Sequence, residues 1–179
     1  MTPGGLAVAL ISSVERLLAE DAVRRALLAY CRGVDRGDAA LAVSAYHPDG
    51  VDHHGTWDGR VDGHFADALA RLVDRTRSTV HVLGPSAFDW IDTRTVRVES
   101  NVMALHEVEV DGRRTIEHLH GRYLDLFTCT DGDWAISERM FVHDLDFLDD
   151  RAAAAYPPHV FANGARGADD PAHGAGRAG

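Results

Sequence analysis

Apolar and polar residues alternate with the period of an amphipathic helix in the first part of the chain. The apolar positions recur every three or four residues and form one stripe, made of Val23, Leu27, Tyr30 and Val34. Ser12 and Glu15 have the spacing of a capping box, which predicts that the helix begins after Ser12. Gly37 is expected to end it, because glycine readily adopts the left-handed conformation of a helix terminus.

Two further helices and one strand are predicted before residue 76. Asp38 can cap a short helix over residues 39–46, which ends before Pro48. Between the second and third helices, residues 50–57 have the pattern of a strand. The third helix is expected after Asp62, and its apolar stripe consists of Phe65, Leu69, Leu72 and Val73.

Strand patterns dominate the rest of the chain. A short strand is predicted over residues 78–84, and longer ones over 95–110, 113–129 and 133–147. Two Asp-Gly pairs, at 111–112 and 131–132, have the sequence of tight hairpin turns. About three helices followed by a mostly antiparallel sheet predict an α+β fold.

The composition narrows the classes of partner and compartment. The 179 residues include 18 basic and 28 acidic side chains, a net charge of −10, without a basic stripe, so neither a nucleic-acid nor a membrane partner is expected. The two cysteines lie far apart in the sequence, which argues against a disulfide framework and favours a reducing, cytoplasmic location. The apolar run near the start is too short for a membrane span and lacks the basic residues of a signal peptide.

The two ends of the chain differ from its centre. Residues 13–150 carry the helix and strand patterns and are predicted to form one domain, preceded by an N-terminal arm over 1–12. Residues 151–162 mix helix formers, prolines and large apolar side chains, so this C-terminal segment could be a pocket lid or an arm at a subunit interface. Residues 163–179 are rich in Gly, Ala, Asp and Pro and are expected to be disordered.

Histidines are the main candidates for chemistry, because their ordinary pKa lies close to neutral pH. The chain has 11 of them, and His81 stands in an apolar strand on the same face as Thr79 and Leu83. A buried imidazole needs a partner for each ring nitrogen, so a core histidine bonded to a backbone carbonyl is the alternative to a catalytic one. Asp35 is unusual in a different way, since the negative end of the helix dipole disfavours an acid in the last turn.

Four features, in order along the chain, resemble the SnoaL-like group of the nuclear transport factor 2-like superfamily. They are Tyr30-x-Arg32-x-x-Asp35, Pro48-Asp49, His81, and the run DGDWAISER at 131–139. The resemblance covers roughly residues 13–147 and points to the branch of scytalone dehydratase, bile-acid 7α-dehydratase and hexachlorocyclohexane dehydrochlorinase. It implies a cone-shaped α+β barrel, in which a curved sheet wraps around a pocket that holds a hydrophobic ligand and an Asp–His dyad.

The resemblance implies that Asp35 is the dyad carboxylate and His81 the base. Asp35 would hold one tautomer of His81 and stabilise the imidazolium that forms when the ring takes a proton. The cationic ring would in turn relieve the unfavourable position of Asp35 at the helix end. Tyr30 matches a tyrosine of the bile-acid enzyme and is the third catalytic candidate, with packing in the helix core as an equal alternative.

The resemblance also implies substrate-binding residues, for each of which packing or surface exposure is an equal alternative: Asp52, His54, Tyr123, Arg139, Phe141 and His143. The second histidine and the Ser/Asn pair of scytalone dehydratase have no match that the sequence identifies. His118 and His120 have a spacing that metal ions accept, but strand alternation places them on the face opposite Leu119 and Tyr123. No metal and no other cofactor is therefore expected.

Together these features predict a cofactor-independent acid–base enzyme that acts on a hydrophobic small molecule. Dehydration of a cyclic, polyketide-like or steroid-like substrate is the favoured reaction. A cyclase or isomerase that uses the same dyad, or a small-ligand binding protein, remains an alternative because a fold does not fix a reaction. A homo-oligomer is also expected, because the outer sheet face would carry Val80, Val82, Leu124 and Leu126. The resemblance to the dehydratase branch implies a trimer, with a dimer as the alternative.

Overall fold

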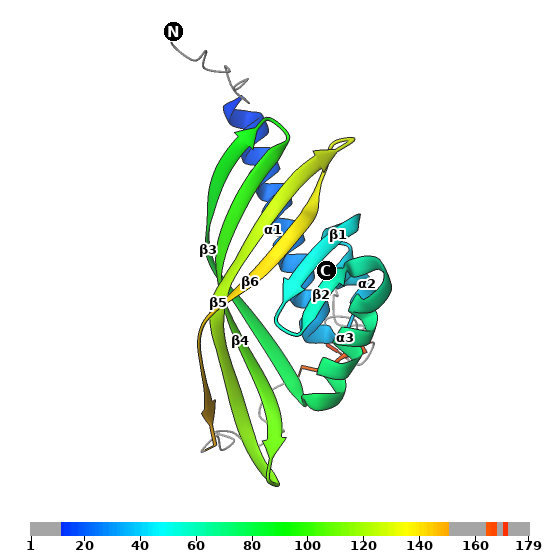
Figure 1. Ribbon diagram of the computed structural model, residues 1–179, viewed down its shortest axis with the longest axis vertical. Helices are drawn as coiled ribbons and strands as arrows, with labels where there is room; N and C mark the ends of the chain where they lie inside the picture. The colour runs from blue at the N-terminus through cyan, green and yellow to red at the C-terminus, as the bar shows by residue number, and fades with distance from the viewer. Residues whose placement is uncertain (1–11, 151–163, 168–169, 172–179) are drawn as a thin grey trace.

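The helices precede most of the strands, as expected for this α+β fold (Figure 1). The computed structural model describes residues 12–150, 164–167 and 170–171. The elements are α1 (Ser13–Arg36), α2 (Ala39–Val43), β1 (Tyr46–His54), β2 (Trp57–Arg60), α3 (Val61–Arg75), β3 (Ser78–Asp92), β4 (Thr95–Val110), β5 (Arg113–Thr130) and β6 (Asp133–Asp149). The α+β class is confirmed, and β4 has the bounds that the sequence predicts.

Both ends of α1 are closed by the residues that the sequence indicates. The Ser12 hydroxyl accepts a hydrogen bond from the backbone N–H of Glu15, whose carboxylate accepts one from the backbone N–H of Ser12. Gly37 adopts a φ of 68° and ends the helix. Asp38 then caps α2 by accepting a hydrogen bond from the backbone N–H of Leu41 at 3.0 Å. These caps leave Asp35 in the last turn of α1, next to the sheet.

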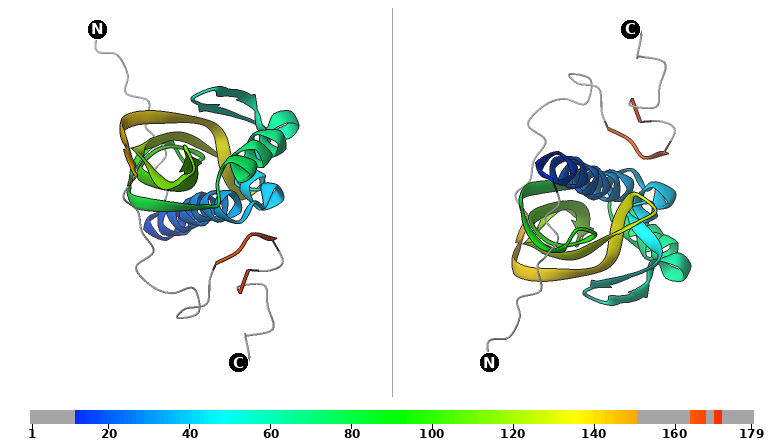
Figure 2. Two further views of the ribbon diagram at one scale, coloured as in Figure 1. Left: turned by 90° about the horizontal axis from the view of Figure 1, so that it is seen from below. Right: turned by 90° about the horizontal axis from the view of Figure 1, so that it is seen from above.

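One six-stranded sheet, in the order β2-β1-β6-β5-β4-β3, forms the other layer. Neighbouring strands are antiparallel except β1 and β6, which are parallel. The sheet curves strongly without closing, and α1 and α3 lie along it (Figure 2). The mostly antiparallel, cone-shaped architecture is therefore confirmed.

Two strands differ from the prediction. The single strand predicted over residues 50–57 is a hairpin of β1 and β2, because the chain turns at Gly55 with a φ of 66°. The short strand predicted from residue 78 continues to the end of β3. A shift of the β3–β4 register between Leu83 and Ser86 accommodates Pro85, which has no N–H to donate to a partner strand.

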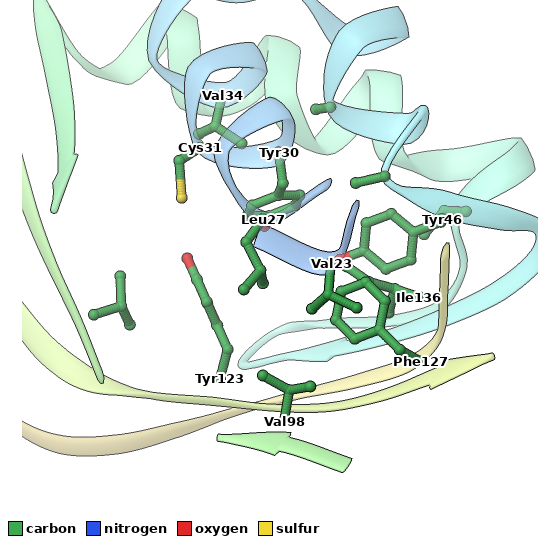
Figure 3. Close-up of a cluster of buried hydrophobic side chains, with 14 of the residues drawn as sticks. Val23, Leu27, Tyr30, Cys31, Val34, Tyr46, Val98, Tyr123, Phe127 and Ile136 are labelled. Atoms are coloured by element: carbon green, nitrogen blue, oxygen red, sulfur yellow. The ribbon is translucent and has the colours of Figure 1, made fainter. Parts of the chain in front are cut away.

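The apolar stripe of α1 packs on the concave face of the sheet and forms the core (Figure 3). The helix contributes Val23, Leu27, Tyr30, Cys31 and Val34, and the sheet contributes Val96, Val98, Tyr123, Phe127 and Ile136. Gly33 lies where α1 meets α2, and a Cβ atom at this position would overlap the backbone of Ala42, 2.7 Å from its Cα atom. Glycine is required for this contact, which holds the last turn of α1 in place.

Part of the predicted disordered tail contacts the folded domain. The Arg166 guanidinium donates hydrogen bonds to the carbonyl oxygens of Val73 and Thr76 at the end of α3. Asp170 pairs with Arg36 at 3.2 Å. Residues 1–11 of the predicted arm and the whole C-terminal segment over 151–162 lie outside the described residues. No helix in the described part of the chain is long and apolar enough to cross a membrane.

The convex side of the sheet exposes large apolar side chains across β3, β4, β5 and β6. Val80 and Val82 are each 48% exposed, whereas Leu124 and Leu126 are half-buried. The residues that pair with Val82 across β4, β5 and β6 lie on the same face of the sheet, so they form one row across these strands. We define the outer apolar face by its exposed members, which are Val80, Val82, Met103, Met140, Leu145 and Phe147.

Gly33→Ala is expected to destabilise the fold, because the added methyl group must displace the α2 backbone. Overpacking of this kind costs about 1–3 kcal/mol. Gly63→Ala in α3 is the matched control: nothing lies within 4 Å of the added Cβ, and alanine favours a helix by about 0.5–1 kcal/mol. Urea unfolding measures both free energies. A Gly33→Ala variant as stable as the wild type would contradict the close packing of α1 against α2.

The outer apolar face leads us to keep the prediction of a homo-oligomer, with a trimer favoured. Multi-angle light scattering at micromolar concentration should give about three times the 19.4 kDa mass of one chain. Val82→Glu should shift the protein toward monomer, because it places an unpaired charge within the covered face. Val110→Glu, at the exposed end of β4, should not. A monomeric wild type would contradict the prediction.

Candidate active site

A cavity of about 660 Å³ lies between α1, α3 and the concave face of the sheet. Its wall is mostly apolar, with polar side chains at separate points. The cavity is large enough for a polycyclic small molecule. Seven of the nine site residues suggested by the sequence line it, namely Tyr30, Asp52, His54, His81, Tyr123, Phe141 and His143. Asp35 and Arg139 lie behind this wall and contact residues that line it.

Asp35 holds His81 by two hydrogen bonds. The Nδ1 atom of His81 lies 2.7 Å from Oδ1 of Asp35, and the His81 backbone N–H donates to Oδ2 at 2.9 Å. Both side chains are almost buried. The carboxylate therefore fixes the tautomer with the proton on Nδ1, which leaves the lone pair on Nε2. These bonds also explain how an acid is accommodated at the negative end of α1.

His106 also lies on the cavity wall, next to His81, and the sequence analysis did not select it as a site residue. Its ring centroid lies 5.9 Å from that of His81. Its Nδ1 lies 2.8 Å from a carboxylate oxygen of Glu117. The same carboxylate accepts two hydrogen bonds from Arg75, one on each oxygen. Nε2 of His106 is buried and has no hydrogen-bond partner among the described residues. A ligand that donates a hydrogen bond could satisfy this atom.

The sequence contained a signal for this pair. A two-residue turn at Asp111-Gly112 places His106 directly opposite Glu117, and the structure has this register. Burial lowers the pKa of His106, although the hydrogen bond that the ring donates to Glu117 opposes that effect. The ring is therefore neutral at pH 7, with an acceptor nitrogen in the cavity.

Arg139 does not reach the cavity, in contrast to the pocket role that the resemblance implies. Its Nε and Nη2 atoms donate to the two carboxylate oxygens of Asp125 at 2.7 and 2.8 Å, and both side chains are fully buried. The guanidinium lies between the rings of Tyr30 and Tyr123, at 4.2 and 4.0 Å from their centroids. Arg139 thus supports two cavity residues from behind.

Tyr30 keeps its phenolic proton. Burial raises its pKa far above the ordinary value, and the charge of Asp52 acts in the same direction. The ring packs edge-on against Tyr46, Phe65 and Tyr123. Tyr30 can therefore donate a hydrogen bond to a ligand oxygen while it serves as a core residue, so the two roles considered for it are compatible.

Asp52 and His54 occupy the β1 side of the cavity. Asp52 is fully buried and accepts a hydrogen bond from the Tyr46 hydroxyl at 2.7 Å. Its Oδ1 atom lies 3.6 Å from Nδ1 of His54. The His54 ring stacks on Phe141 with centroids 4.7 Å apart and planes 6° from parallel. Burial alone would raise the pKa of Asp52, but His54, Arg139 and Tyr46 outweigh it, so the pKa is lowered and the group is an anion.

Gly121 on β5 makes room for the Phe141 ring. A Cβ atom at this position would stand 2.8 Å from that ring and would overlap the carbonyl oxygen of Val142. The β5–β6 register shifts at the same point, between His120 and Gly121. The position of Phe141, and of the imidazole stacked on it, therefore depends on a glycine in the neighbouring strand.

The other histidines lie at the edge of the site or outside it. His143 is half-exposed, and its Nε2 lies 2.9 Å from Asp146. The rings of His118 and His120 stack with Phe147 on β6, away from the cavity. Within the described residues, no cluster of three or more His, Cys, Asp or Glu side chains is placed to hold a metal ion.

Comparison with known proteins agrees with this architecture. The SnoaL-like domain family matches residues 15–140. The chain belongs to this family. No curated protein matches the sequence.

The SnoaL-like domain is also similar in fold to several solved structures. A proposed scytalone dehydratase from Novosphingobium aromaticivorans is 19% identical with a TM-score of 0.67, over 85% of this chain and 100% of that one. A hexachlorocyclohexane dehydrochlorinase from Novosphingobium barchaimii is 17% identical with a TM-score of 0.72, over 82% and 100%. A protein from Kribbella flavida is 13% identical with a TM-score of 0.65, over 74% and 95%.

The contact between His106 and Glu117 in this SnoaL-like domain can be tested by titration. His106 should titrate below the ordinary histidine pKa of about 6.5, because burial disfavours the imidazolium. Glu117→Gln should lower the pKa further, since it removes the carboxylate that stabilises the charged ring. Imidazole NMR measures both values, and Glu109→Gln, an exposed change on β4, is the control. An unchanged His106 pKa in Glu117→Gln would show that the pair does not form in solution.

Proposed function

We propose that this protein is a cofactor-independent lyase that dehydrates a hydrophobic cyclic, polyketide-like or steroid-like molecule by β-elimination. The observation that carries the proposal is the hydrogen bond between Asp35 and His81, at 2.7 Å, on the wall of a mainly apolar cavity. An imidazole whose tautomer is fixed by a buried carboxylate is a general base, and the surrounding apolar wall excludes water from it.

In the proposed reaction, Nε2 of His81 takes a proton from the carbon next to a substrate carbonyl. Asp35 stabilises the imidazolium that results. The electron pair of the C–H bond moves onto the carbonyl oxygen, where the Tyr30 hydroxyl can donate a hydrogen bond to the enolate. Expulsion of the β-hydroxyl then forms the double bond. Proton transfer of this kind contributes about 10²–10⁴-fold, and positioning in the cavity supplies the rest.

His106 gives the site a second polar contact close to the base. Its ring lies on the cavity wall, with its centroid 5.9 Å from that of His81, and its Nε2 is buried without a hydrogen-bond partner among the described residues. This atom can accept a hydrogen bond from a substrate hydroxyl. The substrate would then be bound with its acidic carbon next to His81, and Glu117 would fix the orientation of the second ring.

The similar structures support the reaction class. Two of them, a proposed scytalone dehydratase and a hexachlorocyclohexane dehydrochlorinase, are named for elimination reactions. An elimination that begins with removal of a proton from carbon needs a base and no redox cofactor. The paired imidazole of this chain fits that requirement.

Hydrogen–deuterium exchange tests the base without knowledge of the natural substrate. The wild type should exchange the α-protons of cyclic ketones in D₂O, with 1-tetralone and a 3-ketosteroid as probes followed by NMR. His81→Ala should lose the activity, and Asp35→Asn should lose about 10²-fold or more, because the imidazolium is no longer stabilised.

His118→Ala is the control for the loss of an imidazole outside the cavity. Circular dichroism confirms that each variant is folded. Exchange that persists in both His81→Ala and Asp35→Asn, or its absence from the wild type, would contradict the acid–base proposal. The second result would favour a binding protein.

A further inference from the structure

The cavity contains a second Asp–His pair, formed by Asp52 and His54, which the proposed function does not use. Both side chains project from β1 toward the cavity side, whereas His81 stands on β3. Asp52 is completely buried, and the hydroxyl of Tyr46 fixes one of its carboxylate oxygens. The other oxygen, Oδ1, has no hydrogen-bond partner among the described residues, and neither has Nδ1 of His54.

The geometry directs these two unpartnered atoms toward each other. They lie 3.6 Å apart, so a small rotation of the imidazole brings them to hydrogen-bond distance. Stacking on Phe141 restrains the plane of the ring. With Nδ1 turned to Asp52, the opposite nitrogen, Nε2, is free to meet a ligand.

The nearest charged group to His54 is the carboxylate of Asp52, 3.6 Å from Nδ1. Asp52 is a buried anion, and a negative charge this close stabilises an imidazolium. The neighbouring cation, Arg139, is neutralised by its own bidentate partner, Asp125. The ring faces of Tyr123 and Phe141 complete the surroundings, at 5.9 and 4.7 Å from the imidazole. His54 thus has a fully buried carboxylate beside it, in contrast to His106, whose partner Glu117 is partly exposed.

We propose that His54 is the general acid of the reaction and that Asp52 is its positioning residue. This inference rests on the proposed function, in which His81 is the base. As the C–O bond breaks, its electron pair leaves with the oxygen, and the proton on Nε2 of His54 passes to that oxygen to give water. The enolate electrons form the C=C bond. His81 then holds the proton taken from carbon, and exchange with solvent restores both rings.

The assignment defines the substrate as a β-hydroxy carbonyl compound that spans the cavity. Its acidic carbon would face β3 and its hydroxyl group would face β1. Hydroxide is a poor leaving group and needs a proton as it departs, whereas a carboxylate leaves as a stable anion and needs none. The contribution of His54 should therefore depend on the leaving group, which a residue that only shapes the cavity would not show.

Two substrates with the same ring system make the test. Elimination from 3-hydroxy-1-tetralone and from 3-acetoxy-1-tetralone gives the same fluorescent product, 1-naphthol, and exchange into 1-tetralone reports the base alone. His54→Gln should slow dehydration by about 10²-fold or more and leave acetate elimination and exchange within about two-fold. Asp52→Asn should show the same pattern.

His53→Gln is the matched control, because this neighbour on β1 points to the other face and lies 2.5 Å from Asp58. Equal losses on the two leaving groups in His54→Gln, or no loss on either, would overturn the assignment of His54. So would a wild type that eliminates acetate but not hydroxide. If the wild type does not exchange the α-protons of 1-tetralone or the ketosteroid, the proposed function is overturned. The assignment of His54 as the general acid then falls with it. His54→Gln alone decides the question if Asp52→Asn does not fold.

Discussion

The ion pair between Arg139 and Asp125 holds the floor of the cavity together. Burial alone would lower the pKa of the guanidinium, but the charge of Asp125 outweighs it and raises the pKa, so the cation persists without contact with water. It joins β6 to β5 and lies against Tyr30 from α1 and Tyr123 from β5. Removing one member of such a pair typically costs about 3–5 kcal/mol, because the other charge is left buried and alone. Tyr30 and Tyr123 on the cavity wall are therefore held against this charge.

Above that floor, four imidazoles line the cavity, and three of them have a buried or partly buried carboxylate beside them. Asp35 is nearly buried beside His81, Glu117 is partly exposed beside His106, and Asp52 is fully buried beside His54. Because the wall between them is apolar, interactions among these charges are screened less than they would be in water. Small differences in burial can therefore give three chemically identical rings different protonation states, which is what acid–base chemistry at one pH requires.

Local patterns predicted the elements well, because their causes are local. The cap at Ser12, the turn at Gly37 and the two Asp-Gly turns each depend on a few adjacent residues. The extent of β3 was missed because its continuation past Pro85 depends on pairing with β4, a contact that adjacent residues do not encode. The cavity residues required the same kind of information about distant contacts.

For the site, the family resemblance identified Asp35 and His81, whose contact joins residues 46 positions apart in the sequence. It also placed Arg139 in the pocket, because a match of positions between family members does not show which side chains stand in front of a residue. Tyr30 and Tyr123 cover that side chain. His106 could have been found, since the turn at Asp111-Gly112 fixes its neighbour across the strands.

The packing at Gly121 limits which substitutions the cavity wall can accept during evolution. The Phe141 ring occupies the space that any side chain at position 121 would need, and the His54 imidazole rests on that ring. Substitution at one of these positions therefore changes what the other can tolerate. We therefore expect a relative with an aromatic ring at 141 to keep glycine at 121, and a relative without that ring to accept a larger residue there only if the Val142 carbonyl also shifts. Because the ring at position 54 stacks on the ring at 141, a change at 141 would also alter the packing of residue 54. We therefore expect positions 54, 121 and 141 to change together rather than one at a time.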